Sequence, residues 1–385
     1  MKSKKRPVLR TVLHARVAVV LCASGLIASP SYACDPLSVQ DEYIVVFEKT
    51  ATAPEIDAAF AEAAQLNGGP FKRHFSHALK GLVLRGGETA VSAFARKHAA
   101  VLRTEKNACV SIQGYQANSQ AVGSSAVRVG QVIPSGVVRV GGPLDGRGRN
   151  IWIIDTGVDL KNRDLNIGIG ANFVNDRAGK LENSPQDGSG HGTHVAGIIA
   201  ALNNGVNVVG VASGATVHPV RVLGNDGMGT IDTVLAGVDY VAANAKPGDV
   251  ANMSLSAKGH FPSLHDAIVA TADRGIFFGI AAGNAAASAS EYEPAHIEHP
   301  NVFTASSVSD ADVFSTFSNF GNPPIDFAAP GEAVLSLKLG GGVVAYSGTS
   351  MAAPHVSALL LFRVPRTSGY ASADPDGTPD PVAGY

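Results

Sequence analysis

Residues 150–282 alternate short apolar runs with helical patterns, and this alternation constrains the fold more than any other feature of the sequence. Continuous apolar runs that read as strands occupy residues 150–154, 208–211, 216–223, 250–255 and 276–282. Helical patterns fall between them at about residues 231–244 and 263–274. Strands that are buried on both faces and joined by helices form parallel sheets. The sequence therefore predicts an α/β fold with helices covering a parallel sheet.

Polar residues follow two of the predicted strands. Asp155 comes directly after the first strand, and Asn284 comes shortly after the last. In parallel sheets, functional side chains collect beyond the carboxyl ends of the strands. We therefore expect these two residues to lie at the same edge of the sheet.

Ser350 stands just before a helical, apolar run. If it opens a helix, its hydroxyl lies among unpaired backbone N–H groups at the positive end of the helix dipole. Gly348 permits close approach of another chain, and Pro354 suits the first turn of a helix, where its missing N–H costs little. Serine is also a favoured N-cap. The segment alone therefore leaves open a nucleophile or an ordinary helix start.

The composition is that of a globular protein. The 385 residues are 45% hydrophobic and 16% charged, with a net charge of -2. That is enough apolar material for a sizeable core and enough length for two folded units. The near-neutral charge gives no electrostatic basis for binding nucleic acid or an anionic membrane. We expect a monomer without a nucleic-acid partner and without a membrane anchor.

The N-terminus has the pattern of a secretory signal. Five basic side chains within residues 2–10 precede an apolar run at residues 17–28, and Ser31-Tyr32-Ala33 offers small residues where signal peptidase reads. The run is too short for a stable membrane anchor. We predict a signal peptide over residues 1–33 and a secreted product, extracellular or periplasmic. A lipid anchor on Cys34 is the alternative, although Ser31 and Tyr32 fit a lipoprotein signal poorly.

Two cysteines remain after removal of the signal peptide, Cys34 and Cys109. An even pair in a secreted chain indicates a disulfide. Closing the loop between these two cysteines contributes up to about 4.5 kcal/mol to the free energy of unfolding in the chain-entropy model. Two free thiols are the alternative interpretation, and the sequence does not decide between them.

The segment before residue 114 reads as a small α+β unit with the order β-α-β-β-α-β. Strand patterns cover residues 43–47, 71–76, 81–84 and 108–112. Helical patterns cover about residues 54–66 and 88–98. From residue 114 to residue 130 the chain is rich in Ser, Gln, Gly and Ala, which is typical of an exposed linker and of a site for proteolysis.

Asp155, His191 and Ser350 together offer an orienting carboxylate, a general base and a nucleophile. Histidine suits the role of base because it titrates near neutral pH. The Asn284 side chain is a candidate donor to a developing oxyanion, and one such donor contributes about 3–4 kcal/mol of barrier reduction.

Each of these residues has another interpretation. His191 and His194 are three residues apart, as zinc ligands on one helix turn are, but no matched acidic ligand is nearby; we expect His194 to be structural. Asp155-Thr156-Gly157 matches the active-site tripeptide of aspartic proteases, but a single copy requires a dimer. The second glycine of the G-x-S-x-G elbow is missing around Ser350, which argues against an α/β-hydrolase.

Three segments resemble the signatures of the subtilisin-like serine proteases. They are Asp155-Thr156-Gly157, residues 191–197 (His-Gly-Thr-His-Val-Ala-Gly) and residues 348–355 (Gly-Thr-Ser-Met-Ala-Ala-Pro-His), in the family's order. Residues 43–112, including Ala78-Leu79-Lys80-Gly81, resemble the propeptide inhibitor domain of many of these enzymes. The resemblance implies a ferredoxin-like propeptide and a three-layer, parallel-sheet catalytic domain. The predicted division is 1–33 signal peptide, 34–113 propeptide, 114–130 linker with the maturation site, 131–362 catalytic domain and 363–385 polar tail.

The resemblance also implies roles for individual residues. Asp155, His191 and Ser350 match the family's triad, and Asn284 matches its oxyanion-hole amide. The family's substrate-binding strands and the opposite wall of its specificity pocket match residues Gly227, Met228, Gly229, Ser254, Leu255, Ser256, Ala281, Ala282 and Gly283. Such strands hold an extended peptide by β-augmentation. The small, uncharged pocket walls favour apolar side chains before the scissile bond.

A structural Ca²⁺ site is implied in the same way. Residues 202–208 resemble the family's calcium loop, with Asp164 and Gln131 at its other ligand positions. The implied ligands are the side chains of Gln131, Asp164 and Asn204 and the carbonyls of Leu202, Val206 and Val208. Six oxygens form a shell that suits Ca²⁺. An Asn-rich helix C-terminus without a metal is the alternative.

The sequence departs from the family pattern at three places, the mildest of which is His355-Val356-Ser357-Ala358 in place of the more usual His-Val-Ala-Gly. Ser256-Ala257 stands where glycines are usual, which narrows the expected pocket rim. Pro365 ends the helix after Ser350 early, so we expect apolar surface to be left uncovered. The leading interpretation is a secreted serine endopeptidase, made as a self-processing zymogen, that acts on proteins or peptides and is blocked by its own propeptide. A catalytically weak or inactive peptide-binding protein is the alternative.

Overall fold

The computed structural model describes residue 34 and residues 39–66, 73–112, 116–117, 130–174 and 184–385. The predicted signal peptide, residues 1–33, lies outside these residues, as does most of the predicted linker, residues 114–130. Within the described part of the chain, no helix is both long enough and apolar enough to cross a bilayer.

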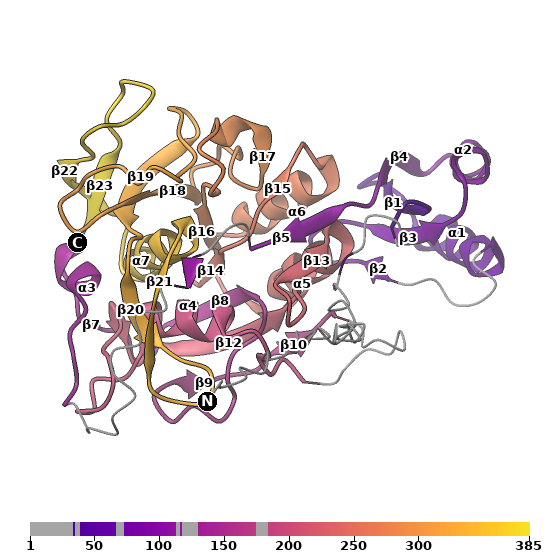
Figure 1. Ribbon diagram of the computed structural model, residues 1–385. Coiled ribbons are helices and arrows are strands. Elements are labelled where there is room, and N and C mark those ends of the chain that lie inside the picture. Colours follow the sequence, from indigo (N-terminus) through magenta and orange to yellow (C-terminus); the bar gives the residue numbers. More distant parts are fainter. Residues whose placement is uncertain (1–33, 35–38, 67–72, 113–115, 118–129, 175–183) are drawn as a thin grey trace, which may run out of the picture. The chain divides into compact units, whose positions relative to one another are not determined.

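A large sheet forms the centre of the C-terminal part of the chain (Figure 1). Its strands run in the order β10-β12-β8-β14-β16-β18-β19-β23-β22, and β9 also pairs with β12. All pairings from β10 to β23 are parallel. The strands are β8 (Asn150–Asp155), β9 (Asn166–Ile167), β10 (Ala171–Asn172), β12 (Thr216–Arg221), β14 (Val250–Met253), β16 (Phe277–Ala281), β18 (Val302–Val308), β19 (Ile325–Pro330), β22 (Arg366–Tyr370) and β23 (Pro381–Gly384). The predicted parallel α/β sheet is confirmed.

Two apolar cores, one on each face of the sheet, make the fold three-layered. Successive side chains of a strand point to opposite faces, and β8 shows this: Ile151 and Ile153 belong to one core, whereas Trp152 and Ile154 belong to the other. The first core includes side chains of α4 (His191–Ala200) and α7 (Thr349–Leu360), and the second includes side chains of α5 (Ile231–Asn244) and α6 (Pro262–Ala272). A central strand buried on both faces has no polar side, which explains its unbroken apolar run.

The N-terminal unit is a four-stranded antiparallel sheet in the order β2-β3-β1-β4. Its elements are β1 (Glu42–Phe47), α1 (Ala53–Leu66), β2 (His74–Phe75), β3 (Gly81–Arg85), α2 (Glu88–Lys97) and β4 (Val101–Lys106). Val45, Leu82 and Leu84 from the sheet form its apolar core with Ala59 of α1 and Phe94 of α2. The positions of β1, β3 and both helices agree with the sequence prediction.

A strand is present at residues 109–111, within the predicted range 108–112, but it is not the last strand of this sheet as predicted. The sheet ends with β4, a strand at its edge that follows α2 almost directly. β4 is only partly buried and carries Arg103, Glu105 and Lys106, so its sequence lacks the apolar alternation of a half-buried strand. β5 (Cys109–Ser111) instead pairs with β13 (Met228–Thr230), outside this sheet.

Cys34 and Cys109 form a disulfide with their Cα atoms 5.7 Å apart. The structure therefore excludes the alternative of two free thiols. The bond ties the first residue after the predicted signal peptide to the first residue of β5. Both sulfurs lie before residue 113, so a cut in the linker leaves this crosslink within the N-terminal unit.

The segment after α7 was predicted to be a polar tail that leaves apolar surface uncovered, and the structure differs. β22 and β23 extend the main sheet beyond β19. Val382 and Ala371 are buried against Val308, Phe314 and Ala328. The apolar signal in this segment is one or two residues long at a time, too short to distinguish an edge strand from a loop.

The remaining elements are short and lie mainly at the rim of the sheet. β7 pairs with β11, β15 with β17, and β20 with β21, which also pairs with β6. They are β6 (Gln116–Ala117), α3 (Ser135–Arg139), β7 (Leu144–Asp145), β11 (Ala212–Ser213), β15 (Ala257–Lys258), a 3₁₀ turn (Ala289–Glu291), β17 (Tyr292–Glu293), β20 (Val334–Leu337) and β21 (Val343–Ser347).

His355 is a fully buried histidine in α7. Its Nδ1–H donates to the Met351 carbonyl at 2.8 Å, and its Nε2 lies where a Cβ on Gly136 would clash at 2.5 Å. Desolvation lowers the pKa of His355 to about 4. Between pH 6.5 and 4 the unfolded chain therefore binds a proton here that the native chain does not, and acidification destabilises the fold.

We predict that replacing His355 by Gln weakens the acid sensitivity of the fold. From pH 7 to pH 5 the neutral, buried His355 accounts for a loss of about 2 kcal/mol in unfolding free energy, since each pH unit below 6.5 contributes about 1.4 kcal/mol. Urea unfolding of both proteins at the two pH values measures this difference. An equal loss in the His355→Gln variant contradicts the prediction.

Candidate active site

Asp155 and His191 meet at the carboxyl edge of the main sheet. Asp155 is the last residue of β8, and His191 is the first residue of α4. His191 Nδ1 lies 2.8 Å from Asp155 Oδ1 and 3.0 Å from Oδ2, and neither side chain is exposed. Asp155 Oδ1 also accepts the Thr156 N–H at 2.7 Å. The carboxylate therefore fixes the ring orientation, with Nδ1 toward the acid and Nε2 on the opposite edge.

Ser350 lies in the first turn of α7. Gly348 precedes the helix with a positive φ of 152°, a conformation that favours glycine. Ser350 is 2% exposed, and its hydroxyl donates to the Ser254 carbonyl at 3.2 Å. Ser254 directly follows β14, so the helix start is bonded to the carboxyl edge of the sheet.

Pro354 was predicted in the first turn of this helix, but it lies in the second turn. A proline there has no N–H for the carbonyl four residues earlier, which is that of Ser350. The Ser254 hydroxyl donates to that carbonyl at 2.9 Å. A side chain from the sheet thus replaces the missing helix bond at the residue that carries the candidate nucleophile.

Asn284 is held against the same helix start. Its Oδ1 accepts the backbone N–H of Thr349 at 2.8 Å and the Thr349 hydroxyl at 2.9 Å. With Oδ1 fixed by two donors, the amide orientation is determined. A Cβ on Gly348 would lie 3.5 Å from Nδ2. The amide N–H₂ is therefore beside the backbone that leads into Ser350.

The segment at β5 lies between the two predicted substrate-binding strands. β5 pairs antiparallel with β13, with Gly229 opposite Val110, and the Ile112 N–H donates to the Gly227 carbonyl at 3.1 Å. On its other side, Ser111 and Ser256 exchange both backbone hydrogen bonds, at 3.0 and 3.2 Å. The chain's own residues 109–112 are thus bound as an added strand.

The next described residues after Ile112 pair with the segment before Ser350. β6 lies antiparallel to the end of β21, with Gln116 opposite Ser347 and Ala117 opposite Tyr346. Ile112 and Gln116 are thus fixed by different strands, one bonded to Gly227 and the other opposite a residue three positions before Ser350.

The predicted pocket wall, Ala281 to Gly283, begins at the last residue of β16, and β16 neighbours β14, the strand that Ser254 follows. β14 and β16 are parallel neighbours with Met253 opposite Ile280. Gly283 has a φ of 104°, and a Cβ there would meet Asn319 Nδ2 at 2.4 Å and Ser256 Oγ at 3.6 Å. The two predicted walls therefore lie close together, and a side chain at residue 283 is excluded.

Three carboxylates that the sequence analysis did not single out support the site or join it to the N-terminal unit. Asp187 is buried before α4 and accepts the N–H groups of Ser189, Gly190 and Thr193 and the hydroxyls of Thr156 and Thr193. Gly190 caps α4 without a side chain, so this carboxylate takes over the role of an N-cap. The only signal for it was an acidic residue in the Gly/Ser loop before His191.

Asp232 and Asp239, the other two carboxylates, join α5 to the N-terminal unit. Asp232 pairs with Arg73 at 2.7 Å and accepts the side-chain amide of Asn107 at 2.7 Å. Asp239 accepts the backbone N–H groups of residues 76–78, at 2.7 to 3.2 Å. Contacts so distant in sequence leave no local pattern, so single-sequence reasoning could not find them.

The Gln131 side chain lies among three of the other predicted cation ligands. Its Nε2 donates to the carbonyl oxygens of Val208 at 3.0 Å and Val206 at 3.3 Å, and also to that of Leu202. The Asn204 side chain donates to Asp164 Oδ1 at 2.7 Å. Three carbonyls aimed at one positively polarised group form an oxygen set of the kind that cations accept. Burial raises the pKa of Asp164, mainly by desolvation.

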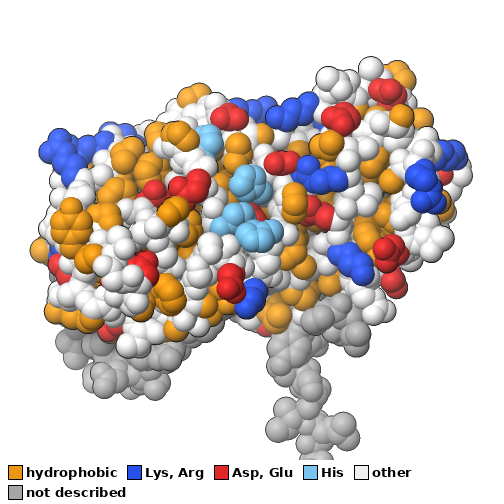
Figure 2. Space-filling model, turned by 90° about the horizontal axis from the view of Figure 1, so that it is seen from above, with side chains coloured by type: hydrophobic (Ala, Val, Ile, Leu, Met, Phe, Trp, Pro, Cys, Tyr) orange, Lys and Arg blue, Asp and Glu red, His pale blue; other side chains and the backbone are white. Residues whose placement is uncertain are grey.

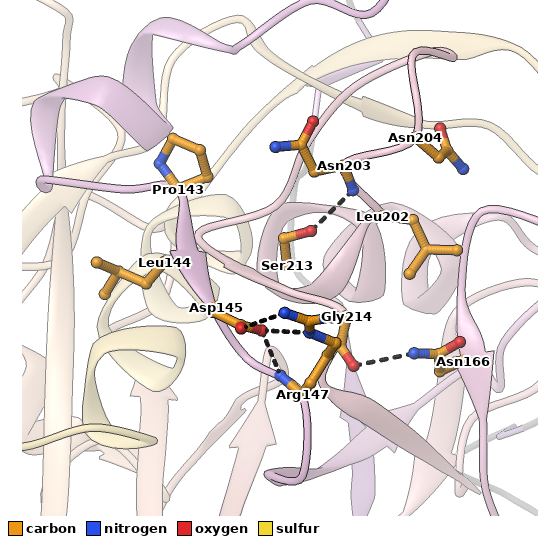
Figure 3. A pocket seen from close by; sticks show the side chains of 10 residues that line it. All are labelled: Pro143, Leu144, Asp145, Arg147, Asn166, Leu202, Asn203, Asn204, Ser213 and Gly214. Carbon is orange, nitrogen blue, oxygen red and sulfur yellow. Dashed lines mark hydrogen bonds and ion pairs between the residues drawn. The ribbon is translucent and has the colours of Figure 1, made fainter.

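A pocket beside this loop is separate from the Asp155–His191 site (Figure 3). Its charged groups satisfy each other: Arg147 pairs with Asp145 at 2.7 Å through Nη2. Asn166 Nδ2 donates to the Gly214 carbonyl at 2.9 Å. Asp155, His191 and Ser350 are not among its lining residues, so the pocket gives no reason to move the candidate active site.

His194 is buried and structural in its contacts, as expected. Its Nε2 lies 3.1 Å from the carbonyls of Val334 and Val344, and its ring stacks on Tyr346. Desolvation lowers its pKa to about 3. These contacts turn Nε2 of His194 toward backbone carbonyls.

Comparisons with known proteins point to one family. A family model described as the Subtilase family matches residues 146–365. Subtilisin BL of Lederbergia lenta is 39% identical over 233 residues, which is 59% of this chain and 82% of the relative. Subtilisin NAT of Bacillus subtilis subsp. natto is 31% identical over 339 residues, 85% of this chain and 82% of the relative. A cold adapted subtilisin-like serine proteinase of known crystal structure has a TM-score of 0.56 and 34% identity, covering 64% of this chain and 96% of that one.

The Asp187 network leads to a stability prediction. Replacing Asp187 by Asn keeps the shape of the side chain but removes the negative charge of the carboxylate, which accepts five hydrogen bonds. We expect a loss of about 2–3 kcal/mol in unfolding free energy, because hydrogen bonds to a buried charged group are the strong ones. Urea unfolding measures it. The exposed Asp273→Asn variant is the control and should change stability by less than about 0.5 kcal/mol; equal effects contradict the capping role.

Proposed function

Because this chain belongs to the subtilase family of serine endopeptidases, we propose that Asp155, His191 and Ser350 are its catalytic triad. The Asp155–His191 hydrogen bond of 2.8 Å supports this proposal. So does the position of Ser350 in the first turn of α7, bonded to Ser254 at the carboxyl edge of the sheet.

Peptide hydrolysis follows from these groups in two steps. Ser350 Oγ attacks the scissile carbonyl carbon while its proton passes to His191 Nε2, and Asp155 stabilises the resulting imidazolium. For this the Ser350 hydroxyl turns from the Ser254 carbonyl toward His191. The Ser350 N–H and Asn284 Nδ2 donate to the oxyanion. His191 then protonates the leaving amine, and water hydrolyses the acyl-enzyme with His191 again as base.

The protein acts as a self-processing zymogen in this proposal. The observation that carries it is the pairing of residues 109–112 with β13 and Ser256, and of residues 116–117 with the end of β21, three residues before the nucleophile. A substrate that crosses the site must pair in the same way. We therefore propose that the first cut falls between Ile112 and Gln116. The alignment with subtilisin NAT also spans more residues than the predicted catalytic domain, 131–362, contains.

The N-terminal unit is the inhibitor in this scheme. Asp232 and Asp239 of α5 bind Arg73, Asn107 and the backbone at residues 76–78, so the unit is held at several points besides β5. A cut after Ile112 leaves β5 in the substrate strands until the whole unit dissociates. Release of activity then requires either dissociation or degradation of the N-terminal unit.

Export before activation completes the proposal. The basic and apolar pattern of residues 1–33 predicts a signal peptide, and the Cys34–Cys109 disulfide is suited to an oxidising compartment. The protein is then secreted, as a monomer, and acts on protein or peptide substrates. The alternative of an inactive binding protein rested on apolar surface left uncovered after α7, and β23 packs against that region.

We predict that the Ser350→Ala variant is secreted but is never cut between Ile112 and Gln116. Removing the nucleophile removes the acyl-enzyme, while the fold and the bound β5 strand remain. Intact mass and N-terminal sequencing of the purified product measure the cut. The Ser290→Ala variant, an exposed serine elsewhere, is the control and should mature normally. Maturation of a pure Ser350→Ala preparation would contradict self-processing.

We also propose that Gln131, Asp164, Leu202, Asn204, Val206 and Val208 hold one structural Ca²⁺. The converging carbonyls and the buried Asp164 carboxylate form a hard oxygen set, and Gln131 Oε1 completes it when the amide is turned over. The ion offsets the cost of burying Asp164. Because Gln131 is a ligand, the mature chain begins before it.

We predict that chelation destabilises the folded protein. Removing Ca²⁺ with EDTA should lower Tm by about 5 °C or more, because an ion that binds only the native state stabilises it by mass action. Adding back Ca²⁺ alone should restore Tm. The Asp164→Asn variant should have a lower Tm than the unaltered chain before chelation, and its Tm should respond weakly to EDTA. An EDTA-insensitive melting curve of the unaltered chain would remove the site.

A further inference from the structure

Histidine side chains gather on the face shown in Figure 2. Among the described histidines, the ring of His296 contacts the ring of His260 at 4.4 Å and the ring of His265 at 5.6 Å between centroids. This group is distinct from the triad and from the calcium ligands. Nothing in the proposed peptidase mechanism uses it, so its arrangement needs its own explanation.

Three residues of this region place metal-ligating atoms together. One nitrogen from each of His260 and His296 and one carboxylate oxygen of Glu293 all lie within 4.8 Å of one another. Glu293 ends β17, where it is paired with Ala257 of β15, and His260 follows β15 by two residues. The short β15–β17 ladder therefore fixes the relative position of the ligands on both of its strands.

The ring nitrogens have the spacing of zinc ligands. His296 Nδ1–H donates to the Tyr292 carbonyl at 3.2 Å, which leaves Nε2 without a proton, and this Nε2 accepts a hydrogen bond from His260 Nδ1 at 3.3 Å. A metal ion that replaces the shared proton needs the two nitrogens at nearly this separation. Two tetrahedral ligands with Zn–N bonds of 2.0–2.1 Å are about 3.3–3.4 Å apart. A histidine that ligates a metal commonly donates its other N–H to a backbone carbonyl, as His296 does.

Glu293 supplies a second, independent indication of a ligand. Its side chain has no exposed surface, and Oε1 has no hydrogen-bond partner among the described residues. Oε2 accepts the Phe261 N–H at 3.3 Å and lies 3.3 Å from His296 Nδ1. An unsatisfied buried carboxylate oxygen costs free energy that a bound cation recovers.

We propose that His260, Glu293 and His296 bind one Zn²⁺ ion. Two imidazole nitrogens and one carboxylate oxygen form a donor set that zinc accepts, with water in the fourth position. The ion crosslinks β17 to the segment after β15, which leads back to the substrate strand at Ser254–Leu255–Ser256. It thereby stiffens one wall of the peptide-binding site without touching the triad. This inference stands apart from the proposed catalytic mechanism.

Zinc binding to the full-length Ser350→Ala chain tests the proposal, because this variant does not digest itself. Untagged protein is stripped of metal and titrated with ZnCl₂ by calorimetry in excess Ca²⁺, which keeps the oxygen-ligand site filled. We expect one zinc per chain and an increase in Tm on binding. Co²⁺ in place of Zn²⁺ should give the visible absorption of a tetrahedral site with nitrogen ligands.

Three further variants separate the site from nonspecific binding. His260→Ala removes an exposed ligand, and Glu293→Gln keeps the shape of a buried one. Each should weaken zinc binding at least about 100-fold, because changes to residues that only support a ligand already cost about 10–100-fold in metal affinity. His265→Ala, in the same group but outside the ligand set, should bind as the parent does. Absence of a stoichiometric zinc isotherm in the folded parent, or equal loss in His265→Ala, would overturn the proposal.

Discussion

The buried hydrogen bond between Asp155 and His191 is the constraint on which the arrangement depends. It joins the end of the central strand β8 to the first residue of α4, and it is fully shielded from solvent. A carboxylate in such a place is tolerated only with strong partners. The backbone N–H of Thr156 and the neighbouring Asp187 network provide the surroundings that hold it. The contacts that hold this part of the fold are therefore the same contacts that orient the proposed catalytic residues.

The start of α7 is bonded to the sheet in a similar way. Ser254 exchanges hydrogen bonds with both the hydroxyl and the carbonyl of Ser350, and the second bond replaces the one that Pro354 removes from the helix. Thr349 holds the Asn284 amide beside it. A proline in the second turn thus becomes part of the candidate site, because it leaves a helix carbonyl free to accept a hydrogen bond from Ser254, a residue of the predicted substrate-binding segment.

The sequence was sufficient for features with a local signature. Unbroken apolar runs such as Ile151 to Ile154 indicated the buried strands. Asp155, His191 and Ser350 each stand in a short segment with a distinctive sequence. What it missed depends on distant or weak signals. The edge strand β4 is half polar, β23 has a two-residue apolar signal, and Asp232 and Asp239 act on residues more than 120 positions away. Edges and interfaces are set by tertiary pairing, which a single sequence does not display.

The position of β5 supports the proposal that the N-terminal unit presents its own chain as the first substrate of Ser350. A fluorophosphonate probe applied to the purified, processed protein tests the central claim most directly, because it reacts only with a serine activated by its neighbours. Intact mass and peptide mapping should find a single adduct, on Ser350. A folded, processed protein without an adduct, or with the adduct on another residue, would contradict the account.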